Sequence, residues 1–372
     1  MERREKGPAE FSALKSILVG MARPSVTAAG TALGTVAALF LAYCLVFGAW
    51  FTASDFYRYL MTDELDTYTN VTHKVLSRQG SHDPAIVVLG TSVMVRCVAG
   101  EEPLSALVQA DSGRRLTTHD LATDAQTSWE MLALVDRLPP NADGVLVIGL
   151  SPGLLEFGSG EGRWQSLQGL IDAPKLGFVS AVMDRAAEDA GAIVPLRTGI
   201  HALDNAAFFL SRRKDIVKNL LGGGKTYGEP LDAYWYKNVN RPDFWQSEIE
   251  KVPGQEALYR QNAVANFTVL ESVVTLARQG GAKGIVIVEA PLNPGWNAVP
   301  QAADYISRYR QDLADFASRV DATLVRTTDD AGLIQSDFVD YEGHLGNAPA
   351  RDRCMGALAR GIGAAMGGQH DG

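Results

Sequence analysis

The sequence predicts an α/β domain, a flavodoxin-like three-layer sandwich in which helices cover both faces of a parallel sheet, preceded by one transmembrane helix. Two observations lead to this expectation. Short apolar, β-branched runs alternate with longer segments of helical periodicity, which is typical of βαβ units. Near the N-terminus, residues 25–54 contain no charged side chain. The first pattern predicts the fold and the second predicts the anchor.

The composition is that of a folded globular chain. Apolar residues make up 46% and charged residues 21% of the 372 positions, which excludes wholesale disorder. The formal net charge of −9 leaves no basic stripe that could neutralise phosphates. We therefore expect no nucleic-acid partner.

Residues 25–54 are predicted to form a single transmembrane helix. The apolar part, 28–51, exceeds the roughly 20 residues that a spanning helix needs, whereas the apolar region of a cleaved signal peptide has only about 7–15. Lys and Arg precede the segment and Asp and Glu follow it. The positive-inside rule therefore makes 1–24 a cytoplasmic tail of a cell (inner) membrane protein and places the remainder in the periplasm or outside the cell. Gly30 and Gly34 form a G-x-x-x-G pair, which can let another helix approach closely.

The remaining elements follow in order. Residues 55–80 are predicted to form an amphipathic stalk helix, and 81–372 to form the outer domain. Strands are expected at 85–89, 144–149, 284–288 and 322–326, with another ending near Asp120; helices are expected at 128–138, 256–278, 304–319 and 349–365. Residues 155–255 interrupt the alternation, with helices expected at 179–190 and 206–221. A connection of this length indicates a cap over a site or a docking surface, the alternative being a solvated helical insertion.

Candidate catalytic residues lie where strands end, which is where parallel sheets bind ligands. Ser92 follows the first strand in a turn whose backbone N–H groups can stabilise an oxyanion, although serine is also a common helix N-cap. His344 lies shortly before the last helix, with Asp340 and Glu342 nearby. A nucleophilic serine needs an imidazole base, and the imidazole needs a carboxylate to orient it. His119 is a rival for the base.

Together these motifs resemble the SGNH (GDSL) hydrolase superfamily: strand, Gly-x-Ser, helix, and finally an acid and His-Leu before the last helix. The resemblance spans residues 84–366 apart from 155–255. With an N-terminal anchor and an outward domain, the chain is similar to membrane-anchored acyltransferases of alginate and cellulose O-acetylation and of teichoic-acid D-alanylation. The resemblance implies Ser92 as nucleophile and His344 as base. No Cys/His cluster has metal-ligand spacing, and we expect neither a metal nor a cofactor. The resemblance also implies a polytopic membrane-bound O-acyltransferase as partner and a polysaccharide as substrate.

The chain departs from the family pattern at several positions. Thr91 replaces the Asp of Gly-Asp-Ser. The family spacing Asp-x-x-His would put the acid at Tyr341, one residue from both Asp340 and Glu342; we favour Asp340 because a loop can absorb one residue and the preceding Phe338 also fits. The segment 121–125 has no glycine where the resemblance places an oxyanion glycine, and Ser151 stands where it places an asparagine. The Ser92 N–H is then the main oxyanion donor. Three further side chains are expected to line the substrate groove: Arg96, Asn293 and Trp296.

The expected activity is a serine acyltransferase, most simply transferring O-acetyl groups to a cell-surface or secreted polysaccharide. Two alternatives use the same fold: a carbohydrate esterase in which water is the acceptor, and a non-catalytic scaffold of an envelope polysaccharide assembly. Cys97 and Cys354 can form a disulfide outside the cytoplasm, or remain buried thiols.

Overall fold

The computed structural model describes residues 26–45, 55–156, 176–178, 180–189, 191, 194, 196–228 and 242–367. Its centre is a sheet of five parallel strands in the order β2-β1-β3-β4-β5. The strands are β1 (Ala85–Leu89), β2 (Thr117–Asp120), β3 (Val145–Leu150), β4 (Gly284–Glu289) and β5 (Thr323–Arg326). This order belongs to doubly wound sheets, whose direction of winding reverses between β1 and β3. The predicted α/β class with a parallel sheet is confirmed.

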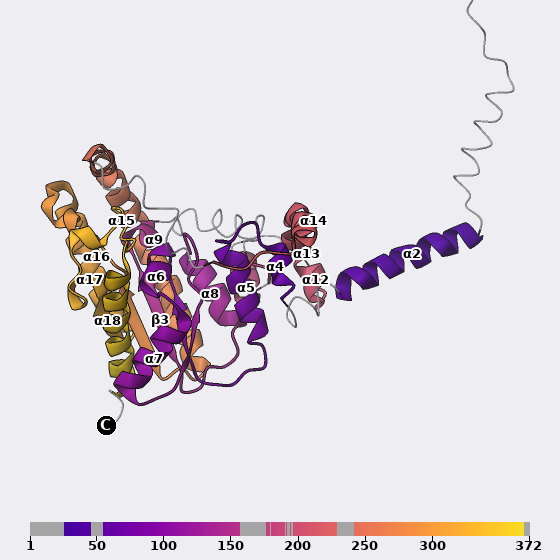
Figure 1. The fold of residues 1–372 in the computed structure, drawn as a ribbon, viewed down its shortest axis with the longest axis horizontal. Coiled ribbons are helices and arrows are strands. Elements are labelled where there is room, and N and C mark those ends of the chain that lie inside the picture. The colour runs from indigo at the N-terminus through magenta and orange to yellow at the C-terminus, as the bar shows by residue number, and fades with distance from the viewer. Residues whose placement is uncertain are drawn as a thin grey trace, which may run out of the picture.

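The apolar strand runs supply two cores, one on each face of the sheet. Because successive side chains of a strand point to opposite faces, Val87 and Leu89 enter one core while Ile86 and Val88 enter the other. Figure 1 shows the covering helices around β3. The first face is covered by α5 (Thr67–Ser77), α8 (Ser128–Arg137), α15 (Pro242–Gln279) and α16 (Pro300–Arg319), the second by α6 (Ser92–Cys97), α7 (Glu101–Ser112) and α18 (Ala348–Gly367). Burial on both faces explains why β1, β3 and β4 are continuous apolar runs.

The sheet's carboxyl edge and the side nearest the N-terminal helix carry shorter elements. They are α4 (Tyr57–Leu60), α9 (Pro152–Glu156), α11 (Ala181–Asp189), α12 (His201–Asp204), α13 (Ala206–Ser211), α14 (Arg213–Gly222), α17 (Thr327–Asp330) and the 3₁₀ turns η2 (Pro294–Ala298) and η3 (Gln335–Asp337).

One helix, α2 (Val26–Cys44), projects from the body (Figure 1). Its mean hydropathy of 1.6 and its length make it the one helix, among the parts of the chain that are described, that could cross a membrane. It contacts the body through a hydrogen bond of 2.8 Å from the Tyr43 hydroxyl to the Ala202 carbonyl oxygen. The N-terminal basic residues and the end of the predicted span, 46–54, lie outside the described residues.

The predicted stalk helix over 55–80 is wrong. Two helices, α4 and α5, occupy it, separated by a turn that Asp66 closes by accepting hydrogen bonds from the N–H groups of Thr62 (2.9 Å) and Thr69 (3.0 Å). An N-cap of this kind starts a new helix rather than continuing an old one. Leu60 and Val75 are fully buried against the domain, so this segment belongs to the body rather than to a stalk.

The helices of the 155–255 segment also differ from prediction. The helix expected at 206–221 is two helices that break at Arg212, and α15 begins at Pro242, well before the expected 256, and passes through Pro253. The helix expected at 179–190 is present as α11.

Candidate active site

Ser92 is the first residue of α6 and follows β1 directly, at the reversal point of the sheet. Its Oγ lies 2.8 Å from Nε2 of His344, and Nδ1 of His344 lies 2.5 Å from Oδ2 of Asp340. His344 and Asp340 are each only 4% exposed. Asp340 can accept a hydrogen bond from the Nδ1–H group, which leaves the Nε2 lone pair to accept a hydrogen bond from the Ser92 hydroxyl. These three side chains, hereafter the triad, have the hydrogen-bond order of nucleophile, base and orienting acid.

The loop that carries His344 explains why the acid lies four residues before the base. Asp340 Oδ1 accepts the backbone N–H groups of Gly343 and His344, each at 3.0 Å, so the carboxylate closes a turn over its own loop. Gly343 has φ 114°, and a side chain there would overlap the carbonyl oxygen of Pro291. Only glycine fits this close approach and this left-handed backbone. The turn brings Asp340 back to the imidazole despite the extra residue.

Glu342, the other candidate acid, is placed differently. Its carboxylate is 3.8 Å from Nδ1 of His344 and its side chain is 52% exposed. It accepts a hydrogen bond of 2.8 Å from the Tyr341 hydroxyl instead. The geometry therefore assigns the orienting role to Asp340.

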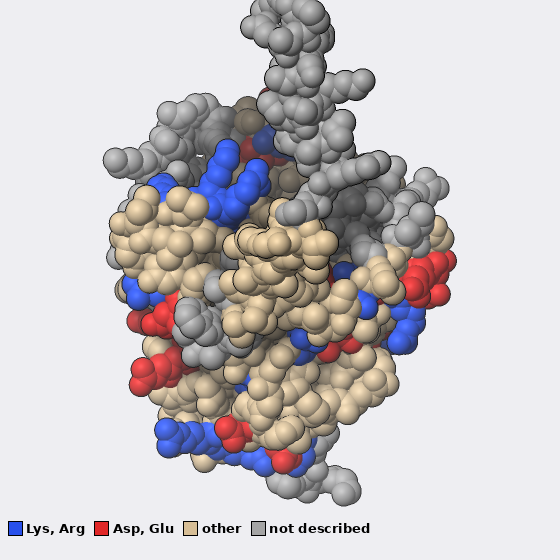
Figure 2. Space-filling view, turned by 90° about the vertical axis from the view of Figure 1, so that its right-hand side faces the viewer, with Lys and Arg blue, Asp and Glu red and all other residues tan. Residues whose placement is uncertain are grey.

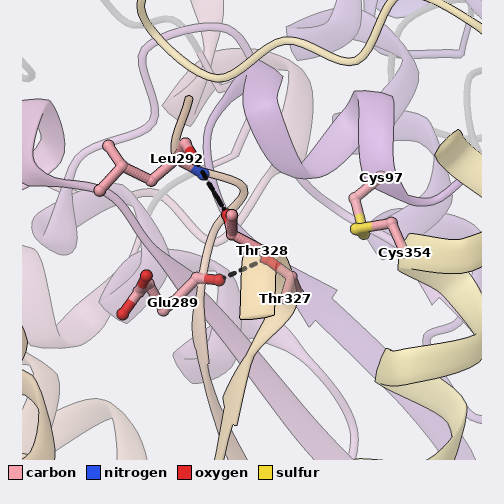
Figure 3. Close-up of a disulfide and its surroundings, with 6 residues drawn as sticks. All are labelled: Cys97, Glu289, Leu292, Thr327, Thr328 and Cys354. Carbon is pink, nitrogen blue, oxygen red and sulfur yellow. Dashed lines mark hydrogen bonds between the residues drawn. A yellow bond between two sulfur atoms is a disulfide. The ribbon is translucent and has the colours of Figure 1, made fainter. Parts of the chain in front are cut away.

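Asn293 holds the loop that carries Asp340, and it lines neither of the two cavities described below. The side chain is fully buried; Nδ2 donates to the Asp340 carbonyl oxygen (2.8 Å) and Oδ1 accepts the Gly295 N–H (2.9 Å). The loop around it is fastened by threonines of α17: Thr328 Oγ1 bonds both the N–H and the carbonyl of Leu292, and Thr327 Oγ1 donates to the Glu289 carbonyl (Figure 3). The predicted groove residue Asn293 is thus a positioning residue.

A disulfide joins the two parts of the chain that supply the triad. Cys97, the last residue of α6, is bonded to Cys354 of α18, with Cα atoms 5.5 Å apart (Figure 3). Of the alternatives that the sequence left open, the structure has the disulfide. It ties the helix that begins with Ser92 to the helix that follows His344.

Two cavities meet at Ser92. The polar cavity, of about 530 Å³, is walled by groups of both signs, and the apolar cavity, of about 370 Å³, is walled mainly by aliphatic and aromatic side chains. Around the polar cavity lie Asp63, Glu64, Arg96, Asp124, Lys225 and His344; around the apolar cavity lie Leu154, Val252, Leu258, Leu292, Trp296 and Ile306. The serine is thus accessible from two sides that differ in chemistry.

The other predicted site residues fall into these two cavities. Arg96, 4% exposed, lies in the polar cavity within electrostatic reach of Asp124. Thr91, Ser151 and Trp296 lie in the apolar cavity, where the Trp296 indole donates to the Tyr341 carbonyl at 2.8 Å.

The segment 121–125 borders the apolar cavity at Ala125. Its φ of 51° is left-handed, a conformation that glycine adopts readily and that costs an alanine about 1 kcal/mol. In the segment where the resemblance places an oxyanion glycine, the left-handed residue is therefore an alanine.

His119 lies elsewhere. It lines a separate surface hollow with His73 and Arg78, and burial, aided by the Arg78 charge, lowers its pKa to about 4. The rival base is therefore not the partner of Ser92.

Sequence reasoning missed several residues of the site. Glu156 lies in the apolar cavity and accepts a hydrogen bond from Tyr305, and burial raises the pKa of its carboxyl. Asp63, Glu64 and Lys225 were missed because they lie in segments interpreted as stalk and insertion. Nothing in their local pattern indicates a site, because charged residues in such segments are usually solvated.

Asp340, Glu342 and His344 are also the one group of three potential metal ligands in the described part of the chain, with ligand atoms within 4.8 Å of one another. His344 Nδ1 is engaged by Asp340 and Nε2 by Ser92, so both ring nitrogens already serve the triad.

No protein-family model matches the chain, and no curated protein is significantly similar to it in sequence.

Proposed function

We propose that this chain is a membrane-anchored, extracytoplasmic serine acyltransferase of the SGNH type that acylates hydroxyl groups of a polysaccharide. The observation that carries the proposal is the triad: Ser92 Oγ within 2.8 Å of a buried imidazole, which is held in turn by a buried carboxylate. A non-catalytic scaffold has no need of such a triad, whose nucleophile is accessible where two cavities meet.

The triad performs acyl transfer in two balanced steps. Ser92 Oγ attacks the carbonyl carbon of the donor ester while His344 Nε2 takes the hydroxyl proton, and Asp340 stabilises the imidazolium. The negative charge on the former carbonyl oxygen is stabilised by the Ser92 backbone N–H, with the Ser151 hydroxyl as a second candidate donor. The imidazolium then protonates the leaving alcohol, and the acyl group remains as an ester on Ser92. In the second step His344 Nε2 takes the proton of an acceptor hydroxyl, whose oxygen attacks the ester carbonyl; the bond to Ser92 Oγ breaks, and the imidazolium returns its proton to Ser92 Oγ.

The two cavities favour transfer over simple hydrolysis. An acyl-enzyme needs one space for the acyl group and another from which the acceptor reaches the same carbonyl. The apolar cavity suits the acyl group, and the polar cavity, lined by Arg96, Lys225 and several carboxylates, suits a hydroxyl-rich acceptor. An esterase, with water as the acceptor, is the second candidate.

The anchor and the disulfide support an outward orientation. A disulfide such as Cys97–Cys354 is typical of oxidising compartments, in agreement with the charge asymmetry around residues 25–54. Cytoplasmic acyl donors such as acetyl-CoA do not reach such a site. We therefore propose a polytopic membrane-bound O-acyltransferase as the partner that delivers the acyl group. Gly30 and Gly34 give α2 an open face, since a methyl group added at either position would meet no atom of the described residues within 4 Å.

The test uses the full chain in lipid nanodiscs with p-nitrophenyl acetate as donor and a soluble oligosaccharide as acceptor. We expect a burst of p-nitrophenol, an acetyl adduct on Ser92 by peptide mass spectrometry, and acetylated oligosaccharide in proportion to acceptor concentration. Ser92→Ala should abolish all three, and Ser272→Ala, which removes an exposed serine of α15, should abolish none. Free acetate as the only product at every acceptor concentration would identify an esterase. Equal activity of Ser92→Ala and the wild type would refute the catalytic proposal.

A further inference from the structure

Helices α13 and α14 carry an apolar stripe that faces away from the body. Its members, Leu210, Val217, Leu220 and Leu221, are 57%, 60%, 56% and 88% exposed. The opposite face of α14 carries Asn219, only 3% exposed, whose amide donates to the carbonyl oxygens of Tyr59 (3.2 Å) and Met61 (2.8 Å). The helix is thus fixed by a polar side chain and presents leucines outward, the reverse of an ordinary surface helix.

The stripe lies next to the end of the candidate anchor. The Tyr43 hydroxyl bonds the Ala202 carbonyl of α12, and α13 and α14 follow α12 directly in the chain. Figure 1 shows the three short helices gathered at the end of α2. With a rise of about 1.5 Å per residue, the 19 residues of α2 extend about 28 Å, close to the roughly 30 Å of a bilayer's hydrocarbon core. If α2 spans the membrane, Tyr43 and the helix it contacts lie at the outer boundary.

Cationic side chains flank the stripe. Arg213, Lys214 and Lys218 are all exposed, and Asp215 is the one acidic residue of α14. Figure 2 views the molecule from the side on which α2 projects toward the viewer, and Lys and Arg side chains are visible around the uncharged centre. Leucines together with lysine and arginine on an exposed helix face are the features of helices that lie in the membrane interface and bind anionic lipids.

We propose that α13 and α14 lie on the outer face of the membrane that α2 crosses. The stripe enters the headgroup region, and Arg213, Lys214 and Lys218 contact phospholipid phosphates. This inference rests on the membrane anchoring in the proposed function and not on the serine chemistry.

The contact would also orient the active site. Soon after α14 the chain reaches Lys225, which donates to the Thr62 carbonyl and forms part of the polar cavity beside Ser92. Lipid contact would therefore hold the polar cavity beside the bilayer, where a membrane-embedded partner could exchange substrate with the serine.

The test places an environment-sensitive fluorophore at single cysteines of the full chain. The chain is inserted into vesicles of phosphatidylcholine with about 30% phosphatidylglycerol, which mimic an anionic leaflet. The background is Cys44→Ala, which removes the one free cysteine among the described residues. Labels go to Val217→Cys and Leu221→Cys, and the matched control is Leu107→Cys, an exposed leucine of α7 on the opposite face of the sheet. Lipids carrying a nitroxide near the headgroup serve as the quencher.

We expect blue-shifted emission and quenching at 217 and 221, with neither at 107. A Lys214→Gln/Lys218→Gln double variant should weaken the quenching, most strongly when phosphatidylglycerol is present. Emission at 217 and 221 that matches the control at 107 would overturn the proposal. Protection of those positions in native membranes but not in these vesicles would also overturn it, in favour of a protein partner. Labelling of Ser92 by a fluorophosphonate in the same samples reports on the proposed function separately.

Discussion

The disulfide between Cys97 and Cys354 should contribute much of the stability of the outer domain. The bond closes a loop across a sequence separation of 257 residues. For a loop of that length, the chain-entropy relation gives about 5.5 kcal/mol at 25 °C from the restricted unfolded state. Residual structure in the denatured chain lowers such values, so we expect Cys97→Ala/Cys354→Ala to reduce the free energy of unfolding by about 3–5 kcal/mol.

The assay is urea unfolding of the full chain in nanodiscs, followed by tryptophan fluorescence. Reduction of the wild type should shift its transition towards that of the double variant, and Cys44→Ala should leave the transition unchanged because Cys44 lies in α2 and is not bonded to another cysteine. The double variant should also react more slowly at Ser92, because the bond joins α6 to the helix that follows His344. A loss below about 1 kcal/mol, with reductant having no effect on the wild type, would refute the reasoning.

Three further predictions concern single side chains. Asp340→Asn should slow acylation of Ser92 by about 10³-fold or more, because an amide no longer holds the required His344 tautomer; burst kinetics measure this. His119→Gln should make the domain more resistant to acid. Folding lowers the His119 pKa from its ordinary 6.5 to about 4, so the wild type loses stability as the pH falls through that interval. Unfolding curves at several pH values show whether the variant loses less stability than the wild type. Glu156→Gln should stabilise the domain at neutral pH, because the raised pKa means that the wild type loses stability as the pH rises above about 4.5; the same pH series measures it.

Each of these has an outcome that would contradict it. Acylation by Asp340→Asn at the wild-type rate would remove that carboxylate from the mechanism, and Glu342→Gln, which changes the exposed neighbour, is the control that should retain most activity. His119→Gln should acylate normally at neutral pH, so a loss of activity there would return His119 to consideration as the base. A Glu156→Gln variant that is less stable than the wild type at neutral pH but equal at pH 4 would show that the carboxylate form is the favoured one.

The centre of the sheet could be predicted because β1, β3 and β4 are buried throughout, and such burial demands continuous β-branched runs. The run at 322–326 also forms a strand, β5, although it is only partly buried. The helices were predicted less well than the strands, because single polar side chains fix them through local caps and through long-range contacts. Asp66 separates α4 from α5 through hydrogen bonds to two N–H groups, and Asn219 fixes α14 through carbonyls some 160 positions away in the chain. The Asn219 contact leaves no local pattern, whereas the Asp66 bonds reach only three and four positions along the chain, so an Asp N-cap signal was present in the sequence.

The triad could be predicted because parallel strands bring their carboxyl ends to one edge. The choice of Asp340 over Glu342 rested on the expectation that a loop can absorb one residue; the structure shows how, through the turn that Asp340 closes with the Gly343 and His344 N–H groups. Asn293 shows the opposite case: a polar residue at a strand end pointed to a groove, yet it is wholly buried and holds the Asp340 loop. Residue type and position in the fold therefore predict which side chains gather, while the hydrogen bonds decide what each one does.

The most direct test of the central claim is labelling of the full chain by a fluorescent fluorophosphonate, which reacts only with an activated serine. We predict that the wild type is labelled at Ser92, that His344→Ala is labelled at least about 10²-fold more slowly because the base is lost, and that Ser92→Ala is not labelled. Wild-type labelling no greater than that of Ser92→Ala would contradict the account and leave the geometry at the end of β1 without a catalytic role.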